Sequence, residues 1–252
     1  LLSLPRILGL GGGSAPAGTP YLAADPELAA CYGRLLVPDG RLRVGIVWAG
    51  NPSHRNDRNR SVPLERLRPL FEADRVAAFS LQVGPKAAEL ASLGAAAAAA
   101  DLGGLLRDFS DTAAVIENLD LIISVDTAVA HLAGALGKPV WLLLPFAPDW
   151  RWGLQSPVTP WYPTMRIFRQ PRPGDWENVA ASVRRRLELL AAGGAPPLPA
   201  AGEQQEAERR RMAVARRETD FARWEDPAQL DPAWEERVRQ AARLIPPGAR
   251  VV

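Results

Sequence analysis

Between residues 43 and 190, short apolar runs alternate with amphipathic segments, and this alternation limits the folds open to the chain. The apolar runs are rich in β-branched residues and predict buried strands at 43–49, 76–82, 120–125, 139–144 and 165–169. The segments between and after them predict helices at 63–72, 85–93, 108–119, 126–136 and 175–190. Residues 95–100 suit either a strand or a helix. This order is typical of an α/β fold with a Rossmann-like, mostly parallel sheet.

Composition changes on both sides of this region. Residues 1–42 are rich in glycine and proline and show little periodicity, and 191–202 form a Pro/Gly/Ala linker. Residues 203–252 carry ten acidic and ten basic side chains, which predicts a charged helical tail. Such a tail is either solvated or in contact with another domain. We therefore expect the Rossmann-like domain to span 43–190.

Composition also excludes several kinds of site. A single cysteine, Cys31, excludes a disulfide framework and a cysteine-based zinc site. Two histidines, His54 and His131, argue against a histidine-rich metal site. The net charge of +2 is too small to indicate a nucleic-acid partner. No apolar run reaches the roughly 18 residues of a membrane span, so we expect a cytoplasmic protein.

The turn after the strand at 120–125, SVDTAVAH, is the first candidate site. In open α/β sheets, ligands bind beyond the carboxyl ends of the strands. Asp126 or Thr127 is expected to cap the following helix, whose first amides, including that of Ala128, suit a phosphate. His131 follows Thr127 by four residues and shares its helix face. The alternative is an ordinary N-cap with a packed histidine.

A polar loop, WAGNPSHRNDRNRS, leaves the first strand and forms the second candidate site. Guanidinium groups bind phosphate with two hydrogen bonds, so a basic loop at a strand end suits an anion. The alternative is a solvated loop. Because both candidate sites lie at the same edge of the sheet, one anion could bridge them. The loop contains three arginines and three asparagines and ends at a serine: Arg55, Arg58, Arg60, Asn51, Asn56, Asn59 and Ser61.

The third candidate site, PFAPDWRWG, follows the strand at 139–144 and continues to Trp161 and Tyr162. Trp150 and Trp152 flank Arg151, and Asp149 precedes them. The two indoles could stack on a sugar or an aglycone, or they could pack the loop onto the domain.

Four segments carry a resemblance to a known family. They are VGIVWAGNPSHRNDRNRSVPL (44–64), FSLQVGP (79–85), the stretch from DFSDTAAVIENLD to PDWRW (108–152) and WYPTMRIFRQPRPGDW (161–176). This region resembles the C-terminal half of a GT-B glycosyltransferase of family 9, the heptosyltransferase type. It is more similar still to the related domains at the end of bacterial tetratricopeptide-repeat proteins.

The resemblance implies roles for several residues. In the family, an Asp-Thr-Gly turn and a histidine lie over the diphosphate and sugar of the donor; here Asp126, Thr127 and His131 match, and Ala128 replaces the glycine. The family's basic residue after the first strand falls on Arg60, with Arg58 as the alternative. The implied donor-binding set is Asn51, Arg60, Ser61, Asp126, Thr127, Ala128 and His131. The implied sugar or acceptor loop is Asp149, Trp150, Arg151 and Trp152.

The resemblance also implies a function. We expect glycosyl transfer from a nucleotide-sugar co-substrate to a glycan or protein acceptor, with no other cofactor and no metal. Residues 1–42 would be a remnant of the N-terminal GT-B lobe or an irregular lead-in, so the chain would hold mainly the donor half. The end of the 203–252 tail resembles the run-in to a class I methyltransferase. The alternatives are a non-catalytic nucleotide-sugar-binding module and a protein-interaction module.

Overall fold

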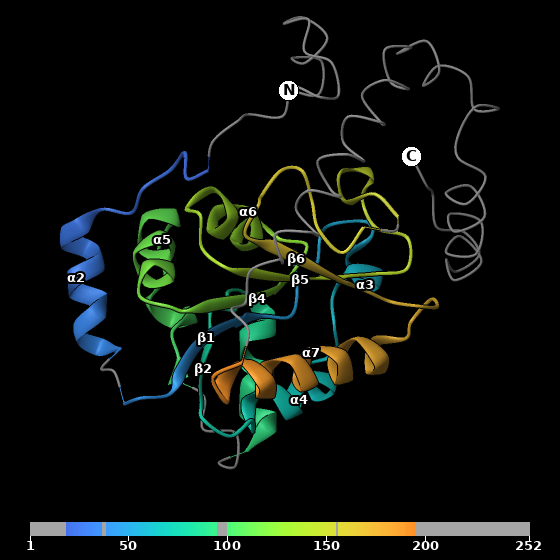
Figure 1. Cartoon of the computed structure of the whole chain (residues 1–252), viewed down its shortest axis with the longest axis horizontal. Coiled ribbons are helices and arrows are strands. Elements are labelled where there is room, and N and C mark those ends of the chain that lie inside the picture. The colour runs from blue at the N-terminus through green and yellow to red at the C-terminus, as the bar shows by residue number, and fades with distance from the viewer. Residues whose placement is uncertain (1–18, 37–38, 95–99, 155, 195–252) are drawn as a thin grey trace, which may run out of the picture.

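A six-stranded parallel sheet forms the centre of the computed structural model, which describes residues 19–36, 39–94, 100–154 and 156–194 (Figure 1). The strand order is β3-β2-β1-β4-β5-β6, and every neighbouring pair is parallel. This confirms the predicted α/β fold with a Rossmann-like sheet. The strands are β1 (Leu42–Val47), β2 (Val76–Ser80), β3 (Ala100–Asp101), β4 (Leu121–Val125), β5 (Val140–Leu144) and β6 (Met165–Arg169).

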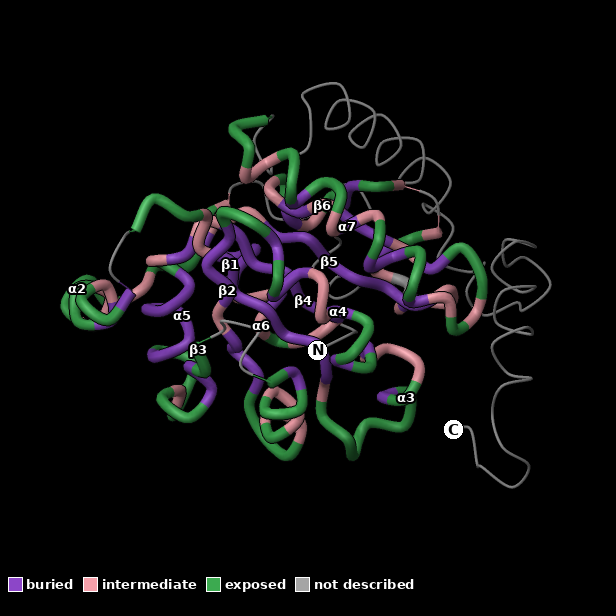
Figure 2. The backbone as a smooth tube through the Cα atoms, turned by 90° about the horizontal axis from the view of Figure 1, so that it is seen from below, coloured by how far each residue is buried: buried purple, intermediate pink, exposed green. Residues whose placement is uncertain are grey.

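Helices cover both faces of the sheet (Figure 1). On one face lie α4 (Leu64–Phe71) and α7 (Trp176–Ala191); on the other lie α2 (Pro26–Leu35), α5 (Phe109–Glu117) and α6 (Ala128–Ala135). Along β1, β4, β5 and β6, alternate residues enter opposite cores, because side chains alternate along a strand. Figure 2 shows the central strands as largely buried, which explains why their sequences are mostly apolar.

One predicted element differs from what the structure contains. The segment predicted as a helix at 85–93 is a 3₁₀ helix, η1 (Pro85–Leu93), which begins after Gly84 with φ at 77° and ends at Gly94 with φ at 70°. Of the ambiguous stretch 95–100, only its end is described, as the first residue of β3. The polar loop of the second candidate site contains a short helix, α3 (Asp57–Arg60), that sequence analysis did not predict.

The helix α2 lies within residues 1–42, where no helix was expected. Asp25 caps it by accepting from the amides of Glu27 and Leu28, and Pro26 stands at its first position. Tyr32 is buried against the core that α5 and α6 share. The folded unit therefore includes residues ahead of 43, which the glycine- and proline-rich composition of this part had concealed.

Other predicted features lie outside the described residues. These are most of the 191–202 linker and the whole 203–252 tail. Within the part that is described, no helix has both the length and the apolar character needed to cross a membrane. Short 3₁₀ helices at η2 (Gly103–Leu105) and η3 (Trp150–Trp152) complete the described elements.

A buried carboxylate at the start of α5 makes the fold sensitive to acid. The Arg107 side chain and backbone amide both donate to Asp111, which holds the pKa of that carboxyl at about 2. A folded-state pKa below the unfolded value stabilises the fold above about pH 4, and the contribution is lost as pH falls towards 2. We expect melting temperatures measured from pH 5 to pH 2 to fall less steeply in Asp111→Asn than in the wild type. Equal slopes would contradict this.

Candidate functional site

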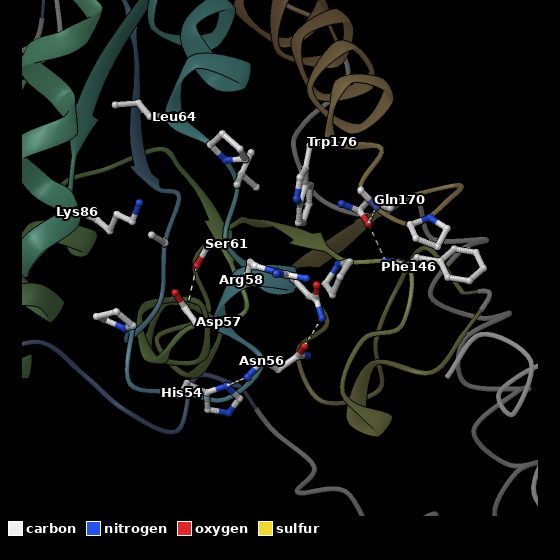
Figure 3. A pocket seen from close by; sticks show the side chains of 18 of the residues that line it. His54, Asn56, Asp57, Arg58, Ser61, Leu64, Lys86, Phe146, Gln170 and Trp176 are labelled. Carbon is white, nitrogen blue, oxygen red and sulfur yellow. Dashed lines mark hydrogen bonds between the residues drawn. The ribbon is translucent and has the colours of Figure 1, made fainter. Parts of the chain in front are cut away.

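A polar network closes the loop between β1 and α4 and fixes its shape. The Ser61 hydroxyl donates to Asp57 Oδ1 at 3.0 Å and accepts from the amide of Gly50 at 3.0 Å (Figure 3). Arg60 Nε also approaches Asp57 Oδ1, at 3.3 Å. Because Asp57 is only 8% exposed, its carboxylate depends on these donors. Ser61 therefore organises the loop, and of the two cavities described below it lines the larger and not the smaller.

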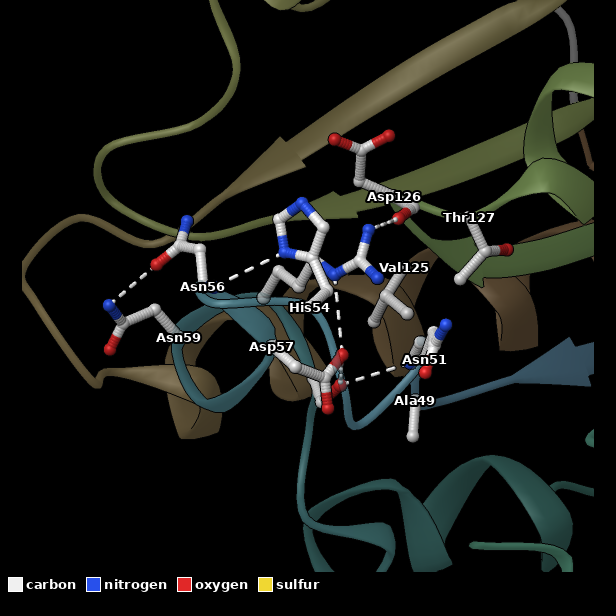
Figure 4. A network of polar contacts seen from close by, with 12 residues as sticks. Ala49, Asn51, His54, Asn56, Asp57, Asn59, Val125, Asp126 and Thr127 are labelled. Carbon is white, nitrogen blue, oxygen red and sulfur yellow. Dashed lines mark hydrogen bonds and ion pairs between the residues drawn. The ribbon is translucent and has the colours of Figure 1, made fainter. Parts of the chain in front are cut away.

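Arg60 joins this loop to the end of β4. Its Nη1 donates to the backbone carbonyl of Asp126 at 2.9 Å, while its Nε stays beside Asp57. Figure 4 shows the loop residues Asp57 and His54 facing Asp126 and Thr127 across the strand ends. The first two candidate sites thus meet, as their common edge of the sheet predicted.

Thr127 begins α6 in a way that differs from the expected cap. It occupies the N-cap position, but its side chain makes no capping hydrogen bond. The Ser124 hydroxyl donates to the carbonyl of Val125, and Thr127 Oγ1 lies 3.0 Å from Ser124 Oγ. Helix geometry leaves the first amides of α6, those of Ala128 and Val129, without an intrahelical acceptor. A ligand anion is one group that can satisfy such amides.

His131 stands one turn into α6, between a carboxylate and a phenol. Its Nε2 lies 3.6 Å from Asp126 Oδ1, and its Nδ1 lies 3.0 Å from Tyr162 Oη. Burial raises the pKa of the Asp126 carboxyl, but His131, the indole of Trp152 and the charge of Arg60 outweigh burial and hold that pKa below its usual range. Asp126 is therefore a carboxylate at neutral pH.

The third candidate site supplies the remaining wall. Arg151 Nη1 forms an ion pair with Asp149 Oδ1 at 2.7 Å. Trp152 is 2% exposed and stacks on His131, with ring centroids 5.1 Å apart and planes 28° apart. The structure therefore places Trp152 behind His131, where it supports that ring and offers no open face to a sugar. Trp150 lies in η3, between Asp149 and Arg151 along the chain.

These three segments surround one cavity of about 480 Å³, which is called the donor cavity below because it contains most of the residues expected to bind a donor. Its size falls within the range of small-molecule sites. Two predicted residues, Asn51 and Ser61, do not line it; Asn51 accepts from the amide of Ser53 within its own turn. The lining residues are His54, Asn56, Arg60, Asp126, Thr127, Ala128, His131, Pro145, Pro148, Asp149 and Arg151.

Sequence analysis assigned no role to His54, Pro145 or Pro148, which line the donor cavity. His54 Nδ1 accepts from the amide of Asn56, and Asn56 Oδ1 accepts from Asn59 Nδ2 (Figure 4). Their residue types do not predict a role in binding. Their position in the loops of the second and third candidate sites is the one feature of the sequence that points to them.

A larger cavity of about 1000 Å³ adjoins the donor cavity and shares the residues His54, Asn56, Pro145 and Pro148 with it (Figure 3). Arg58, the alternative to Arg60 as the basic residue of the loop, lines this larger cavity and not the donor cavity. Arg58 and Arg60 therefore line different cavities. Among the residues that the structure describes, no group of three or more His, Cys, Asp or Glu side chains is placed to hold a metal ion.

Comparison with known proteins identifies the family that this region resembles. Residues 77–170 match the model of Glycosyltransferase family 9 (heptosyltransferase). The match runs from β2 to the end of β6, so it contains the β4–α6 turn and the loop with Asp149 and Arg151, and it begins after Arg60.

Individual proteins are also similar to this chain. Protein FlbA of Caulobacter vibrioides is 29% identical over 182 residues, which make up 70% of this chain and 30% of FlbA. The chain thus spans less than a third of this relative. Among solved structures, E. coli ADP-heptose LPS heptosyltransferase II has 15% identity and a TM-score of 0.45, covering 69% of this chain and 56% of its own. The E. coli heptosyltransferase WaaC with ADP has 18% identity and a TM-score of 0.43, covering 69% and 52%.

Proposed function

We propose that this chain binds the nucleotide-sugar donor of a family 9 glycosyltransferase, with the diphosphate and the sugar in the donor cavity. The observation that carries the proposal is the convergence of Arg60, the N-terminus of α6 and His131 on one cavity. The family match over 77–170 supports it, because that stretch contains the turn with Asp126 and His131.

The cavity contains a guanidinium group and helix N-terminal amides that suit a diphosphate. Arg60 is largely buried, with 17% of its side chain exposed, so its charge is weakly screened by water. The amides of Ala128 and Val129 and the dipole of α6 add partial positive charge beside it. Ala128 carries a methyl group where the family has a glycine, so the phosphate would approach these amides less closely.

Other polar residues of the cavity suit a sugar. Asp126 and Asp149 are hydrogen-bond acceptors, while His131 and Arg151 supply N–H donors within the same space. Sugar hydroxyls both donate and accept, so they need acceptors and donors together. We propose that Asp126 and His131 orient the transferred sugar against the diphosphate.

In the transfer step, an acceptor oxygen forms a bond to the anomeric carbon as the bond from that carbon to the diphosphate breaks. The acceptor proton passes to a base that we assign to none of the described residues. Arg60 and the α6 amides would stabilise the negative charge that develops on the departing nucleoside diphosphate. Because the match covers only 30% of FlbA, the identity of the acceptor and the sugar-transfer activity are also proposals.

Calorimetric titration with ADP, UDP, GDP and CDP tests the donor site. We expect saturable binding of one nucleotide to the wild-type chain and loss of that binding in an Arg60→Ala, Asp126→Ala double variant. Circular dichroism and melting temperature show whether the variant is folded. If a folded wild-type chain shows no binding heat with any of the four nucleotides, donor binding by this chain is contradicted. Binding without sugar transfer in an intact parent protein would favour a non-catalytic binding module.

A further inference from the structure

A line of four polar side chains runs from the surface of the domain into the donor cavity. The Tyr21 hydroxyl donates towards Tyr162 Oη at 3.5 Å, and Tyr162 Oη lies 3.0 Å from His131 Nδ1. On the other side of the ring, His131 Nε2 lies 3.6 Å from Asp126 Oδ1. The line joins the segment ahead of α2, the loop before β6, helix α6 and the end of β4.

The groups on either side of His131 determine which of its ring nitrogens carries a proton. A carboxylate only accepts hydrogen bonds, so the ring nitrogen that faces Asp126 is best occupied by a proton. A neutral imidazole then has an acceptor at its other nitrogen, Nδ1, which faces Tyr162. Burial raises the pKa of the Tyr162 phenol, so this hydroxyl keeps its proton and can donate it in a hydrogen bond.

Packing holds the imidazole in this orientation. Trp152 stacks on one face of the His131 ring, and Tyr162 approaches its edge with ring planes 65° apart. Tyr162 itself rests on Gly134, one turn further along α6, where a Cβ would lie 2.5 Å from two carbons of the phenol ring. Glycine at position 134 therefore permits the approach that brings the hydroxyl within reach of His131.

We propose that Tyr162 is a positioning residue that selects, in the neutral form of His131, the tautomer with its proton on Nε2, so that the histidine presents an N–H donor to the donor cavity. The role of that N–H in holding a sugar or phosphate oxygen rests on the proposed function. The choice of tautomer does not, because it depends only on contacts within the protein. Asp126 and His131 then form an acceptor and a donor side by side, a pair matched to a hydroxyl group.

Nitrogen-15 NMR of the histidine ring, recorded on the full chain without ligand, tests the tautomer. Spectra at increasing pH are followed until the ring shifts stop changing, which selects the neutral form. We expect Nδ1 of His131 to resonate as the unprotonated nitrogen and Nε2 as the protonated one. In Tyr162→Phe, which keeps the ring on Gly134, the ratio of Nε2–H to Nδ1–H tautomers should fall about fivefold, the effect of one net hydrogen bond.

A matched control separates positioning from general loss of a buried phenol. Tyr32 is similarly buried and its hydroxyl donates to the carbonyl of Leu105 at 3.1 Å, away from His131. Tyr32→Phe should leave the His131 nitrogen shifts unchanged, and His54 provides a second reporter in the same spectra. A proton on Nδ1 in the wild type, or an unchanged tautomer ratio in Tyr162→Phe, would overturn the proposal. Neither result would bear on nucleotide binding, which calorimetry measures separately.

Discussion

Replacing Arg60 by alanine is expected to weaken binding of the preferred nucleoside diphosphate by on the order of 100-fold. The guanidinium is mostly buried and contacts both Asp57 and the carbonyl of Asp126, so it is held in place before any ligand arrives. A group that is already ordered loses little conformational entropy on binding, which makes its contribution large. Isothermal titration calorimetry on the wild type and the variant measures the change.

Two further variants sharpen this test. Arg60→Lys keeps the charge but loses the planar fork, so it should bind about tenfold more weakly than the wild type. Arg66→Ala removes an arginine of α4 whose partner, Glu177, is 79% exposed, and it should leave binding unchanged. If Arg60→Ala binds as tightly as Arg66→Ala, the diphosphate does not contact Arg60. Melting temperatures of all three variants exclude loss of the fold as the cause.

The strands of the sheet could be predicted from the sequence because most of them are buried on both faces. Runs such as that of β4, where all five residues are buried, leave an apolar pattern that a helix or a loop seldom shows. The convergence of the loops after β1, β4 and β5 follows from the same parallel order, since all carboxyl ends of the strands share one edge. Both inferences depend on periodicity and topology, and neither needs side-chain detail.

The details of the site depend on packing that the sequence does not show. The resemblance favours Arg60 over Arg58 as the basic residue of the loop, but the sequence does not show that these two residues of α3 line different cavities. Trp152 follows Arg151 directly, yet one is buried behind His131 and the other lines the donor cavity. Tyr162 lies 31 residues from His131 along the chain, and no spacing rule joins them.

The helix α2 illustrates a different limit. Asp25 and Pro26 are an N-cap and a first-turn residue, and Leu28, Tyr32 and Leu36 recur at intervals of four along the helix face, so the local signals for a helix are present. These helix signals lie next to a stretch rich in glycine and proline. The average composition of residues 1–42 therefore does not indicate a helix. Boundaries drawn from composition therefore place the start of this domain too late.

Replacing Trp152 by alanine is expected to lower the free energy of unfolding by about 3–5 kcal/mol, the usual cost of removing a large buried aromatic side chain. The same change should weaken nucleotide binding, because the His131 ring loses the surface on which it stacks. Chemical denaturation measures the first effect and calorimetry the second. Trp152→Phe restores an aromatic face at lower cost in stability and should recover most of the binding.

The matched control is Trp176→Ala, which also removes a buried tryptophan but on the opposite face of the sheet, in the core that α4 and α7 share. It should lose similar stability while binding the nucleotide as the wild type does. Because Trp176 lines the larger cavity and Trp152 supports the donor cavity through His131, the pair also locates the ligand. Equal loss of binding in both variants would mean that the nucleotide extends into the larger cavity. Loss in Trp176→Ala alone would move the donor site there and remove His131 from it.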